Sequence, residues 1–214
     1  MTAIDLSSYA GLTAMMLLTC NLLLGLLVKT NYNPRLQWPH RKLPWPLFKI
    51  HNWTAYIAIV VVVLHPVILL FSERKDVHFT LGDILLPIHS PGQTLYNSLG
   101  AMAFYTFMLV VVTSYFRPRL GYRPWKKLHY AAYLAAALMF VHGTLIDPDI
   151  KNRPTDFLDG EKLLVEGCFL LVAAGSIWRL RRGSEKHRWR KAHAAEKAKA
   201  TAPSDEVSVV DSTK

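Results

Sequence analysis

Five long apolar stretches, separated by shorter segments rich in charge, dominate the pattern of hydrophobic and polar positions. They cover residues 9–28, 50–71, 95–116, 128–146 and 163–178. A helix needs about 20 apolar residues to cross a hydrocarbon core, and a chain inside lipid must satisfy its backbone hydrogen bonds within itself. The pattern therefore predicts an all-α fold, an integral membrane helical bundle of about five transmembrane helices.

The first stretch, residues 9–28, contains no charged residue. No basic segment precedes it, and no cleavage site made of small residues follows it. These features are typical of a retained span and not of a cleaved signal peptide.

The loops between the stretches alternate in charge. Lys and Arg without any acid occupy the loops at residues 29–49 and 117–127, and Lys and Arg also dominate the segment after the fifth stretch. The other two loops contain Asp and Glu as well. Because cytoplasmic loops are rich in Lys and Arg, the sequence predicts an outside N-terminus and a cytoplasmic C-terminus. The membrane expected is a plasma membrane, the inner membrane of a bacterium.

The formal net charge of +10 does not indicate a nucleic-acid partner. The basic residues lie mostly in loops next to apolar stretches, where positive charge sets topology and contacts lipid. Residues 183–214 are expected to form a cytoplasmic tail. It starts as a basic helix at the membrane surface and continues from residue 201 as a polar, disordered end.

Four histidines lie within two of the apolar stretches. His51 and His65 form an i, i+14 pair in the second stretch, and His129 and His142 form an i, i+13 pair in the fourth. Each interval spans roughly 20 Å of helix, which is most of the thickness of a hydrocarbon core. The second and fourth stretches cross in the same direction, because one crossing separates them. Topology therefore pairs His51 with His129 near the cytoplasmic surface and His65 with His142 near the outer surface.

Paired neutral imidazoles on facing helices are suitable axial ligands for haem iron. Iron with two protein ligands has no open position, which suits electron transfer. The pattern thus predicts two stacked haems, no catalytic side chain, and the iron ligands His51, His65, His129 and His142. Two other interpretations stay open. One is interhelical hydrogen bonding by the histidines, and the other is a path for metal ions or protons, although such paths usually gather acids around histidine.

The i, i+13 interval does not fit a regular helix. At about 100° per residue, 14 steps return to within about 40° of the starting face, whereas 13 steps end about 140° away. The sequence therefore predicts that residues 134–139 depart from regular α geometry, for example through a π-bulge. Haems that approach different sides of this helix are the alternative.

Residues near the histidines are candidates for supporting roles. Arg123 and Lys127 can pair with the propionates of the inner haem, and both are equally explained as determinants of topology. His78 and His89 flank an apolar outer loop, residues 77–91, which is too short to span and is expected to lie at the interface or to fold back over the bundle. We interpret these two histidines as solvated loop residues rather than as an acceptor site.

The two histidine spacings resemble those of the ferric reductase-like transmembrane domain. That superfamily includes NADPH oxidases, yeast-type ferric reductases and the haem subunit of bacterial methionine sulfoxide reductase. The local sequences Lys49-Ile50-His51, Leu64-His65-Pro66 and Trp125-Lys126-Lys127-Leu128-His129 are also similar. The resemblance covers about residues 10–180. It implies a haem domain over residues 1–182, with two haem b groups that conduct electrons from the cytoplasmic side outward.

The resemblance also implies partners. The larger members have a flavin and nicotinamide domain after the last span, and we find no such domain here, so the chain looks like one component of an oxidoreductase. The expected donor is a cytoplasmic reductase or a quinol, with flavin or quinone supplied by the partner. The expected acceptor is a ferric chelate or an exported oxidoreductase such as a methionine sulfoxide reductase. The oxidases also tend to have a Phe midway along the second ligand helix, where this chain has Ala135.

Functions of two other classes stay open. A histidine-based transporter of metal or protons predicts metal-dependent flux in liposomes and no Soret band. A non-redox anchor whose basic tail recruits a soluble partner predicts that all four histidines can be replaced without loss of function.

Overall fold

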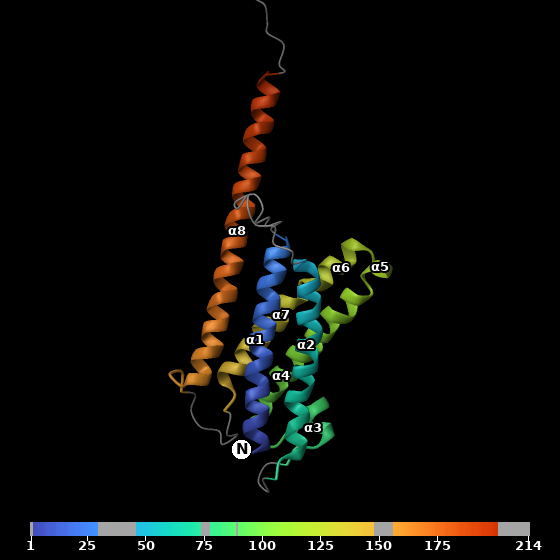
Figure 1. The fold of residues 1–214 in the computed structure, drawn as a ribbon, viewed down its shortest axis with the longest axis vertical. Coiled ribbons are helices and arrows are strands. Elements are labelled where there is room, and N and C mark those ends of the chain that lie inside the picture. The colour runs from blue at the N-terminus through green and yellow to red at the C-terminus, as the bar shows by residue number, and fades with distance from the viewer. Residues whose placement is uncertain (1, 30–45, 74–77, 89, 148–155, 201–214) are drawn as a thin grey trace, which may run out of the picture. The chain divides into compact units, whose positions relative to one another are not determined.

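Helices are the only regular structure in the parts of the chain that the computed structural model describes, residues 2–29, 46–73, 78–88, 90–147 and 156–200 (Figure 1). In chain order they are α1 (Ala3–Lys29), α2 (Leu47–Ile68), the 3₁₀ turn η2 (Leu69–Phe71), α3 (Leu81–Leu85), α4 (Thr94–Tyr115), α5 (Arg117–Leu120), α6 (Tyr122–His129), α7 (Ala131–Leu145) and α8 (Gly160–Ala200). The predicted all-α fold is confirmed. The chain forms two units, residues 1–175 and 176–214, and α8 begins in the first and continues into the second.

Five helical segments within the described ranges are long and apolar enough to cross a membrane. They are Ala3–Val28, Leu47–Phe71, Thr94–Tyr115, Tyr122–Leu145 and Gly160–Ser184, and they overlap the five predicted stretches. Large apolar side chains on these helices are exposed, for example Trp53, Ile57, Val60 and Leu64 on α2. Such a face is costly in water but is well solvated by lipid, so the exposed apolar surface supports a membrane environment.

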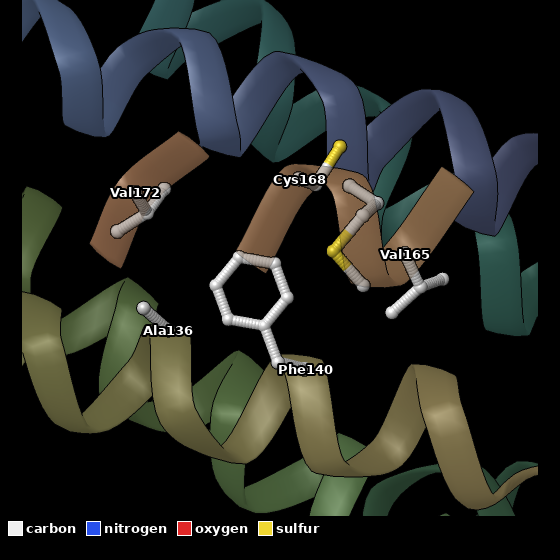
Figure 2. Close-up of a cluster of buried hydrophobic side chains, with 6 residues drawn as sticks. Ala136, Phe140, Val165, Cys168 and Val172 are labelled. Carbon is white, nitrogen blue, oxygen red and sulfur yellow. The ribbon is translucent and has the colours of Figure 1, made fainter. Parts of the chain in front are cut away.

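The first unit is built around two helix pairs. Helix α1 lies along α2, and α4 lies along α7 (Figure 1). The start of α8 joins them through a buried apolar cluster. Phe140 of α7 points toward α8, where Val165, Cys168 and Val172 lie on one face (Figure 2). Met15 of α1 packs into the same cluster.

The apolar outer loop folds back on α4. A capping box between Thr80 and Asp83 starts the short helix α3. The Tyr105 hydroxyl of α4 donates to the Leu85 carbonyl at 2.5 Å, and the Ser98 hydroxyl donates to the Pro87 carbonyl at 3.3 Å. Tyr105 lies roughly 16 Å along α4 from its start, so the segment folds back along α4, in agreement with the sequence-based expectation.

The predicted irregularity in the fourth span exists, but its predicted position is wrong. Helix α7 is continuous through residues 134–139, and no π-bulge occurs in the described part of this span. The departure lies at Tyr130, where the Tyr130 N–H donates to the Lys127 carbonyl at 3.2 Å and the Tyr133 N–H donates to the Tyr130 carbonyl at 3.1 Å. Such bonds rotate the chain by about 120° per residue, against about 100° in an α-helix. The tightened turn therefore brings His129 toward the face of the second histidine.

The basic stretch after residue 183 is helical, as expected, because α8 continues to Ala200. The polar end from residue 201, predicted to be disordered, lies outside the described residues, and so does His89.

Candidate functional site

The structure brings the four histidines together as two facing pairs. The ring centroids of His51 and His129 are 6.3 Å apart, with the ring planes at 77°. The centroids of His65 and His142 are 6.4 Å apart, with the planes at 71°. These are the pairs expected from topology, and all four residues are half-buried.

Helix α1 makes the same pair of reciprocal hydrogen bonds with each of the two histidines of α2. The His65 Nδ1–H donates to the Ser7 carbonyl at 2.7 Å, and the Ser7 hydroxyl donates to the His65 carbonyl at 2.7 Å. The His51 Nδ1–H donates to the Asn21 carbonyl at 3.1 Å, and the Asn21 side-chain amide donates to the His51 carbonyl at 2.6 Å. Ser7 and Asn21 are themselves an i, i+14 pair, so α1 repeats the interval of the histidines on α2.

A glycine follows each accepting carbonyl of α1 by four residues. A Cβ at Gly11 would lie 3.0 Å from the His65 ring, and a Cβ at Gly25 would lie 3.3 Å from the His51 ring. The carbonyl of residue i in an α-helix already bonds the N–H of residue i+4. A second donor reaches that carbonyl easily only where residue i+4 has no side chain, so these glycines admit the imidazoles.

Helix α4 holds His142 in the same way. The His142 Nδ1–H donates to the Tyr96 carbonyl at 2.7 Å. Gly100, four residues later, faces the ring so closely that a Cβ there would lie 2.8 Å from Cε1. The glycine–carbonyl arrangement therefore occurs at three of the four histidines.

His129 has a different partner on α4. Its Nδ1 lies 3.2 Å from the Ser114 hydroxyl oxygen, and that hydroxyl donates to the Val110 carbonyl at 2.6 Å. The hydroxyl proton is thus engaged, and the oxygen accepts from His129. Trp125 stacks on the His129 ring at 5.0 Å between centroids, and its Nε1–H donates to the same Ser114 oxygen at 3.2 Å.

These contacts assign one tautomer to all four imidazoles. A carbonyl oxygen only accepts, so a ring nitrogen bonded to it must be protonated. The Ser114 hydroxyl donates its only proton to the Val110 carbonyl, so it can only accept from His129, whose Nδ1 must also be protonated. Each Nε2 therefore holds a lone pair. A neutral imidazole fixed at Nδ1 by a second partner is the usual form of a metal-ligating histidine.

A closely packed apolar layer separates the two pairs. Ala58 is 0% exposed and packs with Phe107 of α4 and Ala135 of α7. Leu18 of α1 lies against the same cluster. Ala135 lies midway between the two histidines of the fourth span, and the aromatic ring in this layer, Phe107, comes from α4 instead.

The supporting residues predicted from sequence lie at the edge of this site. Arg123 and Lys127 are exposed on α6, and their contact with propionates stays a prediction. His78 is exposed, which agrees with its interpretation as a solvated loop residue. The Arg117 guanidinium lies 4.4 Å from the Trp125 ring centroid, which places a cation next to the aromatic ring that covers His129.

Sequence reasoning missed the residues that hold the histidines. Three of the four acceptors are backbone carbonyls, which any residue type supplies. One signal was nevertheless available, because the first and third apolar stretches repeat the interval between His51 and His65. Gly11 and Gly25 form an i, i+14 pair, and so do Gly100 and Ser114.

Fold and site together define an all-helical integral membrane protein that holds two pairs of facing histidines within its bundle. The profile of the family described as "Ferric reductase like transmembrane component" matches residues 10–140, and the chain belongs to this family. Domains of this family are generally haem-binding, and membership indicates transmembrane electron transfer. No curated protein and no solved structure matches the chain significantly.

Proposed function

We propose that this protein conducts single electrons across a plasma membrane through two haems. His51 and His129 would hold the iron of the inner haem, and His65 and His142 would hold that of the outer haem. The observation that supports this best is the orientation of the four imidazoles: each is bonded at Nδ1, and the rings face each other in pairs.

The spacing of each pair fits an iron between two imidazoles. A metal–imidazole bond is about 2.0–2.1 Å long and a ring nitrogen lies about 1.1 Å from its centroid, so two ligand rings on one axis have centroids about 6.3 Å apart. The observed separations are 6.3 and 6.4 Å. Two rings that share an axis can differ in rotation about it, which accommodates planes at 77° and 71°.

When bound, haem would supply a reversible one-electron change at its iron. The chain's own residues do the rest. Ser7, Asn21, Tyr96 and Ser114 fix the ligand rings. The layer around Phe107 keeps the space between the pairs apolar and dry. Arg123 and Lys127 are proposed to pair with the propionates at the cytoplasmic end.

The loop charges support the proposed direction, and the proposed partners are those that the sequence resemblance implies. Electrons enter from a cytoplasmic reductase or a quinol, with flavin or quinone supplied by that partner. They leave to a ferric chelate or to an exported oxidoreductase on the outer side. A methionine sulfoxide reductase is one candidate of the second kind.

The test is haem stoichiometry in the full-length protein, purified in detergent and supplied with haem. We expect two haems b per chain by pyridine haemochrome analysis, with a low-spin reduced spectrum. The variant H65A/H142A should retain one haem. H78A is the matched control, because His78 is an exposed histidine outside the bundle, and should retain two. Absence of haem from the wild-type protein, combined with metal-dependent flux in liposomes, would support a transporter instead.

A further inference from the structure

Three histidines share one mode of support, and the fourth departs from it at one position. The accepting carbonyl and the glycine are four residues apart in Ser7/Gly11, Asn21/Gly25 and Tyr96/Gly100. On α4 the equivalent pair for the fourth histidine is Val110/Ser114, which follows Tyr96/Gly100 at an i, i+14 offset. Serine thus occupies the position at which the other sites have glycine.

The serine changes how the imidazole reaches the helix. At Gly100 the ring of His142 lies so close that a Cβ would be 2.8 Å from it, and its Nδ1–H bonds the carbonyl directly at 2.7 Å. At Ser114 a Cβ and a hydroxyl stand between the ring and the backbone. The hydroxyl accepts from His129 at 3.2 Å and donates to the Val110 carbonyl at 2.6 Å.

We propose that Ser114 is the positioning residue of the inner histidine pair, and that its hydroxyl relays to the Val110 carbonyl the hydrogen bond that the other three histidines make directly. This inference rests on the proposed haem function. It assigns to a side chain, Ser114, a part in fixing the tautomer of His129 that backbone carbonyls have at the other three histidines.

The two histidine pairs also differ in their contacts at Nδ1. At the inner pair, His51 bonds the Asn21 carbonyl at 3.1 Å. The Ser114 oxygen is shared between the His129 Nδ1–H and the Trp125 Nε1–H, each at 3.2 Å. Both outer histidines instead bond carbonyls at 2.7 Å. A shorter bond at Nδ1 raises the basicity of the ligand. The outer imidazoles are therefore the stronger donors to iron, and the two haems should differ spectroscopically.

The test compares three variants of the full-length protein loaded with haem. S114A has neither an acceptor oxygen nor an opening to the Val110 carbonyl, and loss of such an outer partner typically costs about 10–100-fold in metal affinity. S114G would reproduce at position 114 the arrangement seen at Gly100, in which the imidazole reaches the backbone carbonyl directly. T113A is the matched control, because the adjacent Thr113 hydroxyl makes the same kind of bond to its own helix at 2.7 Å and does not support a histidine.

The readouts are haem transfer to apomyoglobin and the low-spin ferric EPR signals, with the outer haem as an internal reporter of folding. We expect S114A to release the inner haem at least tenfold faster and to keep the outer one, whereas S114G and T113A keep both. Retention of the inner haem by S114A, or equal loss in S114A and S114G, would overturn the proposal. Absence of haem from the wild-type protein would instead contradict the proposed function, so the two failures are distinguishable.

Discussion

His142 lies against Gly100 so closely that a Cβ at position 100 would be 2.8 Å from the ring carbon Cε1. The atoms involved are a rigid helix backbone and a ring fixed by its own hydrogen bond to Tyr96, so neither can easily yield. The substitution G100A should therefore displace the imidazole and reduce the haem content from two per chain to one, with loss of the outer haem. Pyridine haemochrome analysis measures this directly.

The control for that substitution is G167A. Gly167 lies in α8 with nothing within 4 Å of a built Cβ, so the same change in a membrane helix should leave both haems. If G100A and G167A bound equal amounts of haem, the glycine would have no role in admitting the ring.

Replacing each of the two glycines of α1 by alanine should lower haem affinity by different amounts. A Cβ at Gly11 would lie 3.0 Å from the His65 ring, whereas a Cβ at Gly25 would lie 3.3 Å from the His51 ring. A few tenths of an ångström of movement relieves the second contact, so G25A should lower haem affinity less than G11A. Haem release rates of the two variants rank them, and a reversed order would count against the close-approach argument.

Lys162 caps the C-terminal end of α7, the helix that contains His142. Its side chain is buried, and its Nζ donates to the Gly143 carbonyl at 3.1 Å and to the Ile146 carbonyl. Hydrogen bonds from charged groups contribute about 1.5–3 kcal/mol each, so K162M should lower the melting temperature of the haem-loaded protein and speed release of the outer haem. K49M, at an exposed lysine of α2, is the control. Identical melting curves for the two variants would show that Lys162 contributes nothing here.

Trp125 competes with His129 for the Ser114 oxygen. The substitution W125F keeps a ring stacked on the imidazole but removes the competing N–H. The remaining His129 bond should strengthen, which raises ligand basicity, favours ferric iron and shifts the midpoint potential of the inner haem downward. A spectroelectrochemical titration follows both haems at once. W53F, at an exposed tryptophan of α2, should shift neither, and an unchanged potential in W125F would argue against sharing of the oxygen.

The orientation inferred from loop charges can be tested with reporters fused after Lys214. We expect a fluorescent protein to be active and alkaline phosphatase to be inactive at this position, because the basic segments favour the cytoplasm. Active phosphatase would reverse the assignment of inner and outer haems. The pairing of the histidines would be unaffected, since it depends only on their contacts.

The sequence by itself determined the five spans and the two histidine pairs. Hydropathy and span length require only local composition, and the pairing of His51 with His129 requires only that two helices run in the same direction. The displaced irregularity shows the limit of this reasoning. From the i, i+13 interval we predicted a departure from α geometry, but only packing decided that it occurs at Tyr130 and not within residues 134–139.

The tertiary structure alone decided what holds each imidazole. The acceptors for three rings are backbone carbonyls, and these are chosen by which helix lies alongside and by which glycines allow close approach. A backbone carbonyl has no signature in the sequence, because every residue has one. Ser114 is the exception, because its side chain is visible in the sequence. Its hydroxyl can support an imidazole only because α4 places it next to His129. The order and spacing of residues therefore determine that this chain forms a membrane bundle with histidines at two depths. Contacts between helices determine which ring nitrogen of each histidine keeps the lone pair that can bind a metal.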